Sequence, residues 1–157
     1  MRIQIVSLAL TALIAVSGSA TAADDSRVAA EIMALARAQW ASEAAGKNVA
    51  EQMASVAGDY TEFNQDYAAR LDGKELNVRL YDAISSDGSK SLAGDMVNPK
   101  VQVYGDTAIL TYNFVGVTRD KDGKVASSNA KSTRVYSKIG GKWMLVHANF
   151  APAASKY

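Results

Sequence analysis

The sequence predicts an α+β fold in a single domain, with helices in the first half of the chain and an antiparallel sheet in the second. Two observations predict it. Apolar residues recur at helical spacing up to about residue 85, and beyond residue 95 they lie in strand-like runs separated by turn signals. The chain has 157 residues, of which 48% are hydrophobic and 21% charged, enough for one buried core.

Residues 1–22 have the pattern of a secretory signal peptide. Arg2 is followed by a mostly apolar run, and Ala20-Thr21-Ala22 offers small residues at both recognition positions of a cleavage site. The apolar run is shorter than the roughly 20 residues that span a membrane, which favours cleavage over a retained anchor. We expect a mature domain of residues 23–157, periplasmic or secreted, with no membrane contact after cleavage.

The charge balance argues against a nucleic-acid partner. Of 17 basic residues, Arg2 is removed with the signal, leaving 16 against 16 acidic ones, so the mature chain is formally neutral. The chain has one histidine and no cysteine, the residues from which zinc sites draw most ligands. We therefore expect neither a metal nor a cofactor.

The first helix is expected to begin at Asp24-Asp25-Ser26, whose side chains suit the amino end of a helix, and to stop at Gly46. Trp40 is expected to plug the core. Residues at helical spacing along this segment are Val28, Ile32, Leu35, Ala36, Gln39 and Trp40.

A shorter second helix is predicted after Asn48, which forms a capping-box pattern with Glu51, and is expected to end by Gly58. Residues 59–63 then have the composition of a brief strand. Because side chains alternate along a strand, Tyr60 and Glu62 would share one of its sides.

A third helix is predicted from the Asp72-Gly73 turn to about Ser85, because apolar residues follow at four-residue steps. Residues 85–94, rich in serine, glycine and aspartate, are expected to form an exposed, mobile loop. Beyond them we expect an antiparallel meander that starts with residues 96–104 and has Pro99 at a bulge or an edge.

The adjacent glycines Gly140 and Gly141 predict a tight hairpin, because both can adopt positive φ at little steric cost. With Ile139 opposite Lys142, Arg134 would lie opposite His147. One face, expected to be polar and aromatic, would hold Thr111, Asn113, Ser132, Arg134, Tyr136, Trp143, Leu145, His147 and Asn149. The other, expected to be plain core, would hold Leu110, Tyr112, Phe114, Val135, Met144, Val146, Ala148 and Phe150.

From Val28 to Ala153 the chain resembles the nuclear transport factor 2-like superfamily, and within it the SnoaL-like proteins and the association (hub) domain of calcium/calmodulin-dependent protein kinase II. Several motifs in the same order carry the resemblance. They are the Asp72-Gly73 turn, VNPKVQVYGDTAILTY at 97–112, TRVY at 133–136, Gly-Lys-Trp at 141–143, and Val146-His147 leading to Ala151-Pro152-Ala153.

The resemblance implies a cone-shaped, cystatin-like fold in which a curved antiparallel sheet packs on about three amino-terminal helices. It also implies a pocket in the concave face and a homodimer. In the hub domain the arginine matching Arg134 lines that pocket, and His147 matches a hub histidine. Where this chain has Asn149 and Phe150 the hub has a histidine and an arginine, and it has histidines near Lys100 and Gln102, so its cationic pocket is only partly retained.

We take seven residues as candidate ligand-binding residues: Tyr60, Glu62, Tyr81, Asn113, Arg134, His147 and Asn149. In a functional interpretation, Arg134 presents a planar fork to a carboxylate or enolate-like group, with neutral His147 as its partner. In a structural one, Arg134 satisfies a buried acceptor and His147 is a core residue. Likewise, Glu62 is either a catalytic base or a surface residue. The sequence leaves these alternatives open.

Three functions are compatible with these patterns. The first is an exported, homodimeric accessory protein that binds a small organic molecule, for which an anion is one option, without converting it. The second is a proton-transfer enzyme of the isomerase or hydratase type that uses the same pocket, as in a ketosteroid-isomerase-like reaction. The third is an oligomerisation or interaction module. No catalytic residue is assigned.

Overall fold

The computed structural model describes residues 18–153, so most of the predicted signal peptide lies outside the described residues. In chain order the elements are α1 (Gly18–Ala44), α2 (Val49–Gln52), β1 (Val56–Asn64), β2 (Leu71–Asp72), α3 (Lys74–Ser85), β3 (Lys90–Tyr104), β4 (Thr107–Arg119), β5 (Val125–Ile139) and β6 (Lys142–Pro152). Within residues 18–153, no helix is long and apolar enough to cross a membrane.

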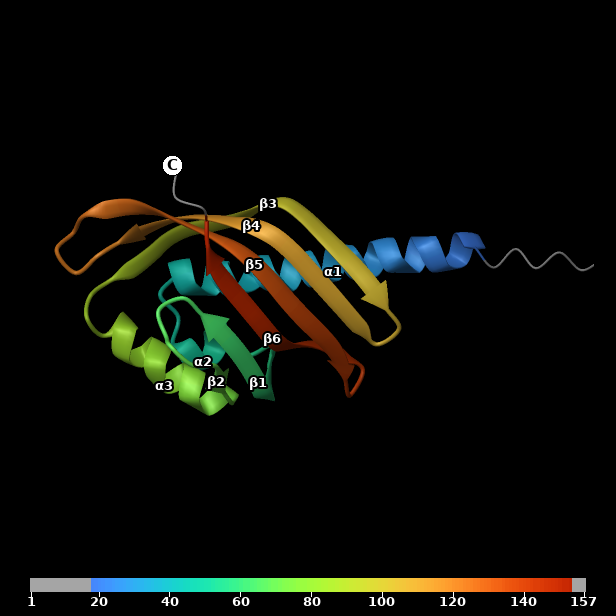
Figure 1. The fold of residues 1–157 in the computed structure, drawn as a ribbon, viewed down its shortest axis with the longest axis horizontal. Helices are drawn as coiled ribbons and strands as arrows, with labels where there is room; N and C mark the ends of the chain where they lie inside the picture. The colour runs from blue at the N-terminus through green and yellow to red at the C-terminus, as the bar shows by residue number, and fades with distance from the viewer. Residues whose placement is uncertain (1–17, 154–157) are drawn as a thin grey trace, which may run out of the picture.

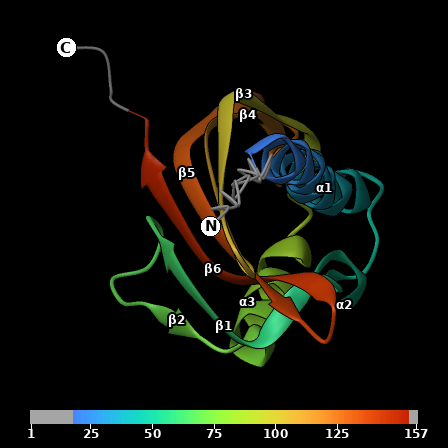
Figure 2. The same ribbon diagram turned by 90° about the vertical axis from the view of Figure 1, so that its right-hand side faces the viewer.

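One curved six-stranded sheet, in the order β2-β1-β6-β5-β4-β3, wraps around the helices (Figure 1). Figure 2 shows the strands curling from β3 round to β2, with α1 beside β3 and α3 close to β1. This confirms the predicted α+β cone. The sheet is mixed, however, because β1 pairs with β6 in parallel. A parallel pair is possible here because the rest of the sheet separates the two strands in sequence.

Helix α1 lies against the sheet through side chains at four-residue steps. Val28, Ile32, Ala36 and Trp40 are all buried, which confirms the predicted stripe and the core role of Trp40. The helix begins at Gly18, before the predicted start at Asp24. The residues between these two positions include several alanines, which are strong helix formers. It ends just before a glycine with φ of 67°, as predicted.

The segments that lead to the third helix follow the prediction with shifted boundaries. The Asn48 side chain accepts a hydrogen bond from the Glu51 backbone N–H at 2.9 Å, which confirms the capping box. Helix α2 has only four residues, so β1 begins at Val56, earlier than predicted. Tyr60 and Glu62 are buried on the same side of β1, as predicted.

Strand β3 is longer than predicted. It begins at Lys90, so the second half of the predicted loop over residues 85–94 is strand instead. Pairing with β4 compensates for the low strand propensity of its serine, glycine and aspartate residues. The prediction of Pro99 at a bulge or an edge is confirmed. Strand β3 is the last strand of the sheet, the register shifts beside Pro99, and Asn98 has φ of 53°.

The predicted register of the final hairpin is correct only near the turn. Ile139 pairs with Lys142, but a bulge then leaves Val146 without a partner on β5. Beyond it Arg134 pairs with Ala148 instead of His147, so the predicted juxtaposition of Arg134 and His147 is wrong. A shift of one residue moves every later side chain to the other face. His147 and Asn149 therefore leave the face of Arg134.

The predicted pairing of β4 with β5 is also shifted by one residue. Leu110 pairs with Arg134 and Tyr112 with Ser132, so these buried side chains share one face. Asn113, predicted on that face, pairs with Lys131 and is exposed on the other. The predicted pairing needs an even number of residues in the turn before β5, whereas the turn between Arg119 and Val125 has an odd number. The residue types alone do not fix the length of such a turn.

The Phe114 ring lies over a paired glycine position, where Gly94 of β3 faces Gly116 of β4. A Cβ atom at Gly116 would stand 2.7 Å from two ring atoms of Phe114, and one at Gly94 would stand 2.8 Å from another. The ring also packs against Trp40, with centroids 5.3 Å apart. Because Gly94 and Gly116 have no side chains, the Phe114 ring can pack between the sheet and Trp40 of α1.

We expect Gly116→Ala to lower the free energy of unfolding by about 1–3 kcal/mol, because the added methyl displaces a packed ring. Urea unfolding followed by circular dichroism measures this. Gly58→Ala is the matched control, since no atom lies within 4 Å of its added Cβ, and it should change stability by less than about 0.5 kcal/mol. Equal effects of the two substitutions would contradict this account.

Candidate functional site

A cavity of about 770 Å³ lies inside the cone. Its size is in the usual range of small-molecule sites. Four of the predicted ligand residues line it, namely Tyr60, Glu62, Tyr81 and Arg134, together with Gln39, Trp40, Tyr112, Phe114, Ser132 and Phe150, among others. The interior thus combines aromatic walls with a buried cation and a buried carboxylate.

Arg134 is the buried cation of the cavity, and the residue is only 4% exposed. Its Nε donates to the Tyr112 hydroxyl at 2.9 Å and its Nη1 to Gln39 Oε1 at 2.6 Å. The guanidinium carbon also lies 5.5 Å from the ring centroids of both Trp40 and Phe150. Two aromatic rings and two neutral acceptors therefore fix its position without neutralising its charge.

Next to Arg134, Ser132 carries an unsatisfied hydroxyl. The residue is 4% exposed and lines the cavity, yet its Oγ has no hydrogen-bond partner in the described part of the chain. Buried hydroxyls are normally hydrogen-bonded, and leaving one unpaired costs roughly 1–3 kcal/mol. The unpaired Oγ beside a buried guanidinium is what a bound polar group would satisfy.

Glu62 is the buried carboxylate of the cavity and is 2% exposed. Its Oε2 accepts from the Tyr60 hydroxyl at 2.8 Å, and its Oε1 accepts from the Tyr81 hydroxyl at 2.8 Å and from Asn64 at 2.9 Å. Three side-chain donors from β1 and α3 therefore hold the buried carboxylate. The interpretation of Glu62 as a surface residue is wrong, because alternation along β1 turns it into the cone.

Glu62 and Arg134 stand in one row across the sheet, with Ala148 between them. Ala148 is the register partner of Glu62 on one side and of Arg134 on the other. Since neighbouring strands are about 4.8 Å apart, the two charged residues have Cα atoms roughly 10 Å apart. No ion pair joins them among the described residues. The small alanine leaves space for two long charged side chains on one face.

The phenols around these charges are held neutral. Burial, together with the nearby Glu62 carboxylate, raises the pKa of Tyr60 and that of Tyr81 well above the ordinary value for tyrosine. Burial also raises the pKa of Tyr136, although the neighbouring Arg134 opposes the shift. At neutral pH each of these hydroxyls keeps its proton and can donate one hydrogen bond.

Three of the predicted ligand residues lie outside the cavity. His147 is on the opposite face, where its Nδ1 is 2.8 Å from the Thr61 hydroxyl and its ring meets Phe63 edge-on at 6.0 Å. Asn113 and Asn149 are exposed on that same outer face. All three were placed in the site by a register that the structure does not have.

Sequence reasoning missed several cavity residues. Ser132 was placed on the correct face but not selected, because nothing in the sequence marks a hydroxyl that lacks a partner. Tyr112 and Phe150 were assigned to the wrong face. Gln39 belonged to the predicted stripe of the first helix, at the helical step beside Trp40, which was a usable signal for its inward direction.

Glu43 of α1 lines the cavity towards solvent. Partial burial raises the pKa of its carboxyl, while the Arg134 charge and the Ser91 hydroxyl oppose that shift. In residues 18–153 no three histidine, cysteine, aspartate or glutamate side chains form a group that could hold a metal ion.

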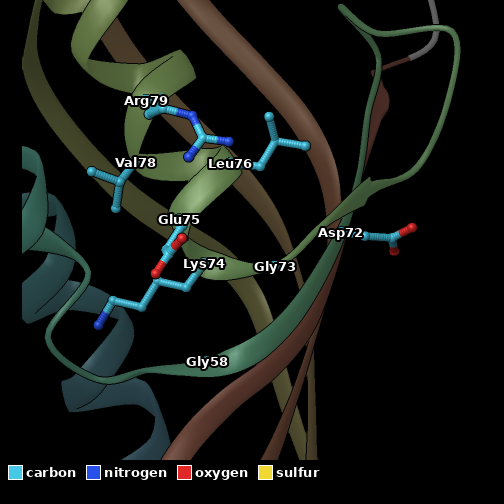
Figure 3. Close-up of a pocket in the computed structure, with 8 residues that line it drawn as sticks. All are labelled: Gly58, Asp72, Gly73, Lys74, Glu75, Leu76, Val78 and Arg79. Atoms are coloured by element: carbon cyan, nitrogen blue, oxygen red, sulfur yellow. The ribbon is translucent and has the colours of Figure 1, made fainter.

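A separate hollow of about 730 Å³ lies at the start of α3 (Figure 3). The Asp72 carboxylate points away from α3 in this view and pairs with Arg70 at 2.6 Å. The other charged side chains that line the hollow are of both signs, and Glu75 and Arg79 are exposed. It lacks the buried charged groups of the cone cavity, and we therefore place the candidate site in the cone.

The family model of the calcium/calmodulin dependent protein kinase II association domain matches residues 23–154. The hub homology domain from Chlamydomonas reinhardtii has a TM-score of 0.67 at 23% identity, over 81% of this chain and 98% of that chain. A nuclear transport factor 2-like protein from Salmonella enterica has a TM-score of 0.71 at 15% identity, over 84% and 95%.

A third similar structure is a nuclear transport factor 2-like protein with a cystatin-like fold from Novosphingobium aromaticivorans. Its TM-score is 0.66 at 18% identity, and the match covers 87% of this chain and 91% of that chain. At these identities the solved structures establish the fold and nothing further. Together with the family match, they confirm the predicted resemblance to the association domain and its nuclear transport factor 2-like fold.

The neutral phenols predict a loss of stability at alkaline pH. Because the folded pKa of Tyr60 and of Tyr81 exceeds 10, the unfolded chain binds fewer protons above that pH, and unfolding becomes easier as pH rises. Above roughly pH 10, each phenol should lower the free energy of unfolding by about 1.4 kcal/mol per pH unit.

Urea unfolding between pH 9 and pH 12 measures this slope. Tyr81→Phe should make the slope shallower by the contribution of one phenol, about 1.4 kcal/mol per pH unit. Tyr104→Phe should leave it unchanged, because Tyr104 is 61% exposed in the folded chain. A slope that is the same in wild type and in Tyr81→Phe would show that the Tyr81 hydroxyl is not held neutral by Glu62.

Proposed function

Because this chain belongs to the calcium/calmodulin dependent protein kinase II association domain family and has the nuclear transport factor 2-like fold, we propose that it is a binding module whose cone cavity takes a small organic anion. We further propose that it binds this molecule without converting it. The fold alone supports either a ligand-binding or an oligomerisation module, so the residues of the cavity must support the choice.

The observation that carries the proposal is the buried Arg134 beside the unpaired Ser132 hydroxyl, in one cavity. A carboxylate has acceptor sites only, and a guanidinium with an adjacent hydroxyl can offer it both N–H and O–H donors. A bound carboxylate would give the buried cation a counter-charge and the hydroxyl an acceptor. Trp40 and Phe150 would cover the apolar part of such a ligand.

We also propose export and self-association. Export rests on the signal-like pattern of residues 1–22. Self-association rests on family membership and on the outer face of the sheet, which exposes Phe63, Val97, Val115 and Val117 between polar residues. A contact between two such faces would cover these side chains in a symmetric homodimer.

A second candidate function is proton transfer by Glu62. The supporting observation is that a buried carboxylate lines the cavity, hydrogen-bonded to two phenols. Three donors already occupy most of its acceptor sites, and His147, the other candidate base, lies on the opposite face. Binding without conversion is therefore the function that the geometry favours.

Carboxylate binding is tested with butanoate, pentanoate, hexanoate and benzoate, each compared with its primary amide by isothermal titration calorimetry. At least one carboxylate should bind, and at least tenfold more tightly than its amide, because only the anion complements Arg134. Arg134→Met should abolish this preference, whereas Arg79→Met, an exposed arginine on α3, should retain it. If no carboxylate is preferred over its amide, the proposal fails.

Self-association is tested by light scattering during size-exclusion chromatography. The purified protein should have a mass of twice one chain. Val115→Glu should shift it towards the monomer, because a buried charge at the sheet contact would be unpaired. Ile84→Glu, at an apolar residue of α3 that is also exposed (47%, against 39% for Val115), should stay dimeric. A monomeric wild-type protein would refute self-association.

A further inference from the structure

The two ends of the cavity differ in the hydrogen-bonding capacity that they leave for a ligand. At one end are Arg134, Ser132 and Tyr112. The Tyr112 oxygen accepts from Arg134, so its own proton is left for an acceptor, and the Ser132 hydroxyl has no partner in the described chain. With the guanidinium, this end presents donors.

The Glu62 end presents acceptors. Tyr60 and Tyr81 each donate their single hydroxyl proton to Glu62, so towards the cavity both phenol oxygens offer lone pairs only. The Asn64 amide nitrogen also donates to Glu62, and its oxygen accepts from the backbone N–H of Asp66. The carboxylate itself has about four acceptor directions, of which these contacts use three.

The register sets the distance between the two ends. Glu62 and Arg134 flank Ala148 in one row, with Cα atoms roughly 10 Å apart, and both side chains line the same cavity. Each charge is buried without an opposite charge bonded to it among the described residues. A molecule lying along this row would meet donors at one end and acceptors with a negative charge at the other.

We propose that the ligand is a zwitterion, an amino-carboxylic acid whose carboxylate binds at Arg134 and Ser132 and whose ammonium binds at Glu62, Tyr60 and Tyr81. An ammonium group has three donors and a positive charge, which match three acceptor atoms that carry one negative charge. A hydroxyl group has one donor and no charge, and would match them less well. This inference rests on the proposed function, because it uses the same cavity and the same anion site.

A matched ligand series separates the two ends in the unmodified protein. The probes are 5-aminopentanoate, pentanoate, 5-hydroxypentanoate and pentylamine, followed by amino acids one carbon shorter and longer, all titrated by calorimetry. We expect one amino acid of the series to bind roughly ten- to hundredfold more tightly than the carboxylate lacking the amine, since charge-assisted hydrogen bonds are added. The hydroxy acid should fall between them and the amine alone should bind weakest.

Glu62→Gln assigns the ammonium site. This substitution should erase the preference for the amino acid over the plain carboxylate while leaving carboxylate binding within about threefold. Glu75→Gln, the same substitution at an exposed residue of α3, should keep the full preference. Thermal melts establish that each variant is folded before titration. If Glu62→Gln does not fold, Tyr81→Phe serves, and should reduce the preference at least threefold.

The outcomes distinguish this inference from the proposed function. If pentanoate binds at Arg134 and no amino acid binds more tightly, the zwitterion is refuted and the anion site stands. If the hydroxy acid equals or exceeds the amino acid, the ammonium assignment is wrong. If no probe of the series binds at all, both proposals fail together.

Discussion

The bulge at Val146 is the constraint on which the interior depends. It shifts β6 by one residue against β5, so that Ala148 and Phe150, instead of His147 and Asn149, face the inside of the cone. Because β1 pairs with β6 beyond the same point, the shift also aligns Glu62 with Ala148. One extra residue thus decides which charges share the cavity and places the histidine on the opposite face.

The cone cavity holds two buried charged groups, and each is held by a different set of side chains. Aromatic rings from α1 and β6 hold the Arg134 guanidinium, while phenols from β1 and α3 hold the Glu62 carboxylate. Burying two charges costs free energy, and a direct ion pair would recover part of it. Here the charges stay apart, separated by an alanine. Such an arrangement is weak as a device for stability and well suited to receive a ligand with two charged ends.

The sequence predicted the fold better than the site. The stripe of α1, the Asn48 cap and the Gly140-Gly141 turn are local patterns, and each was confirmed. The bulge was not predictable, because Val146 is an ordinary strand residue and no glycine or proline marks the position. Residues placed by local alternation, such as Glu62, kept their face, whereas those placed by counting across a hairpin, such as His147, did not.

The same limit applies to chemistry. An arginine in a strand can be read from the sequence, but the unpaired Ser132 hydroxyl beside it depends on what surrounds the side chain in three dimensions. The most direct measurement is a crystal structure of the protein soaked with 5-aminopentanoate. We expect its carboxylate within hydrogen-bond distance of Arg134 and Ser132 and its amine at Glu62. The reverse orientation, or a ligand bound only in the hollow at α3, would contradict it.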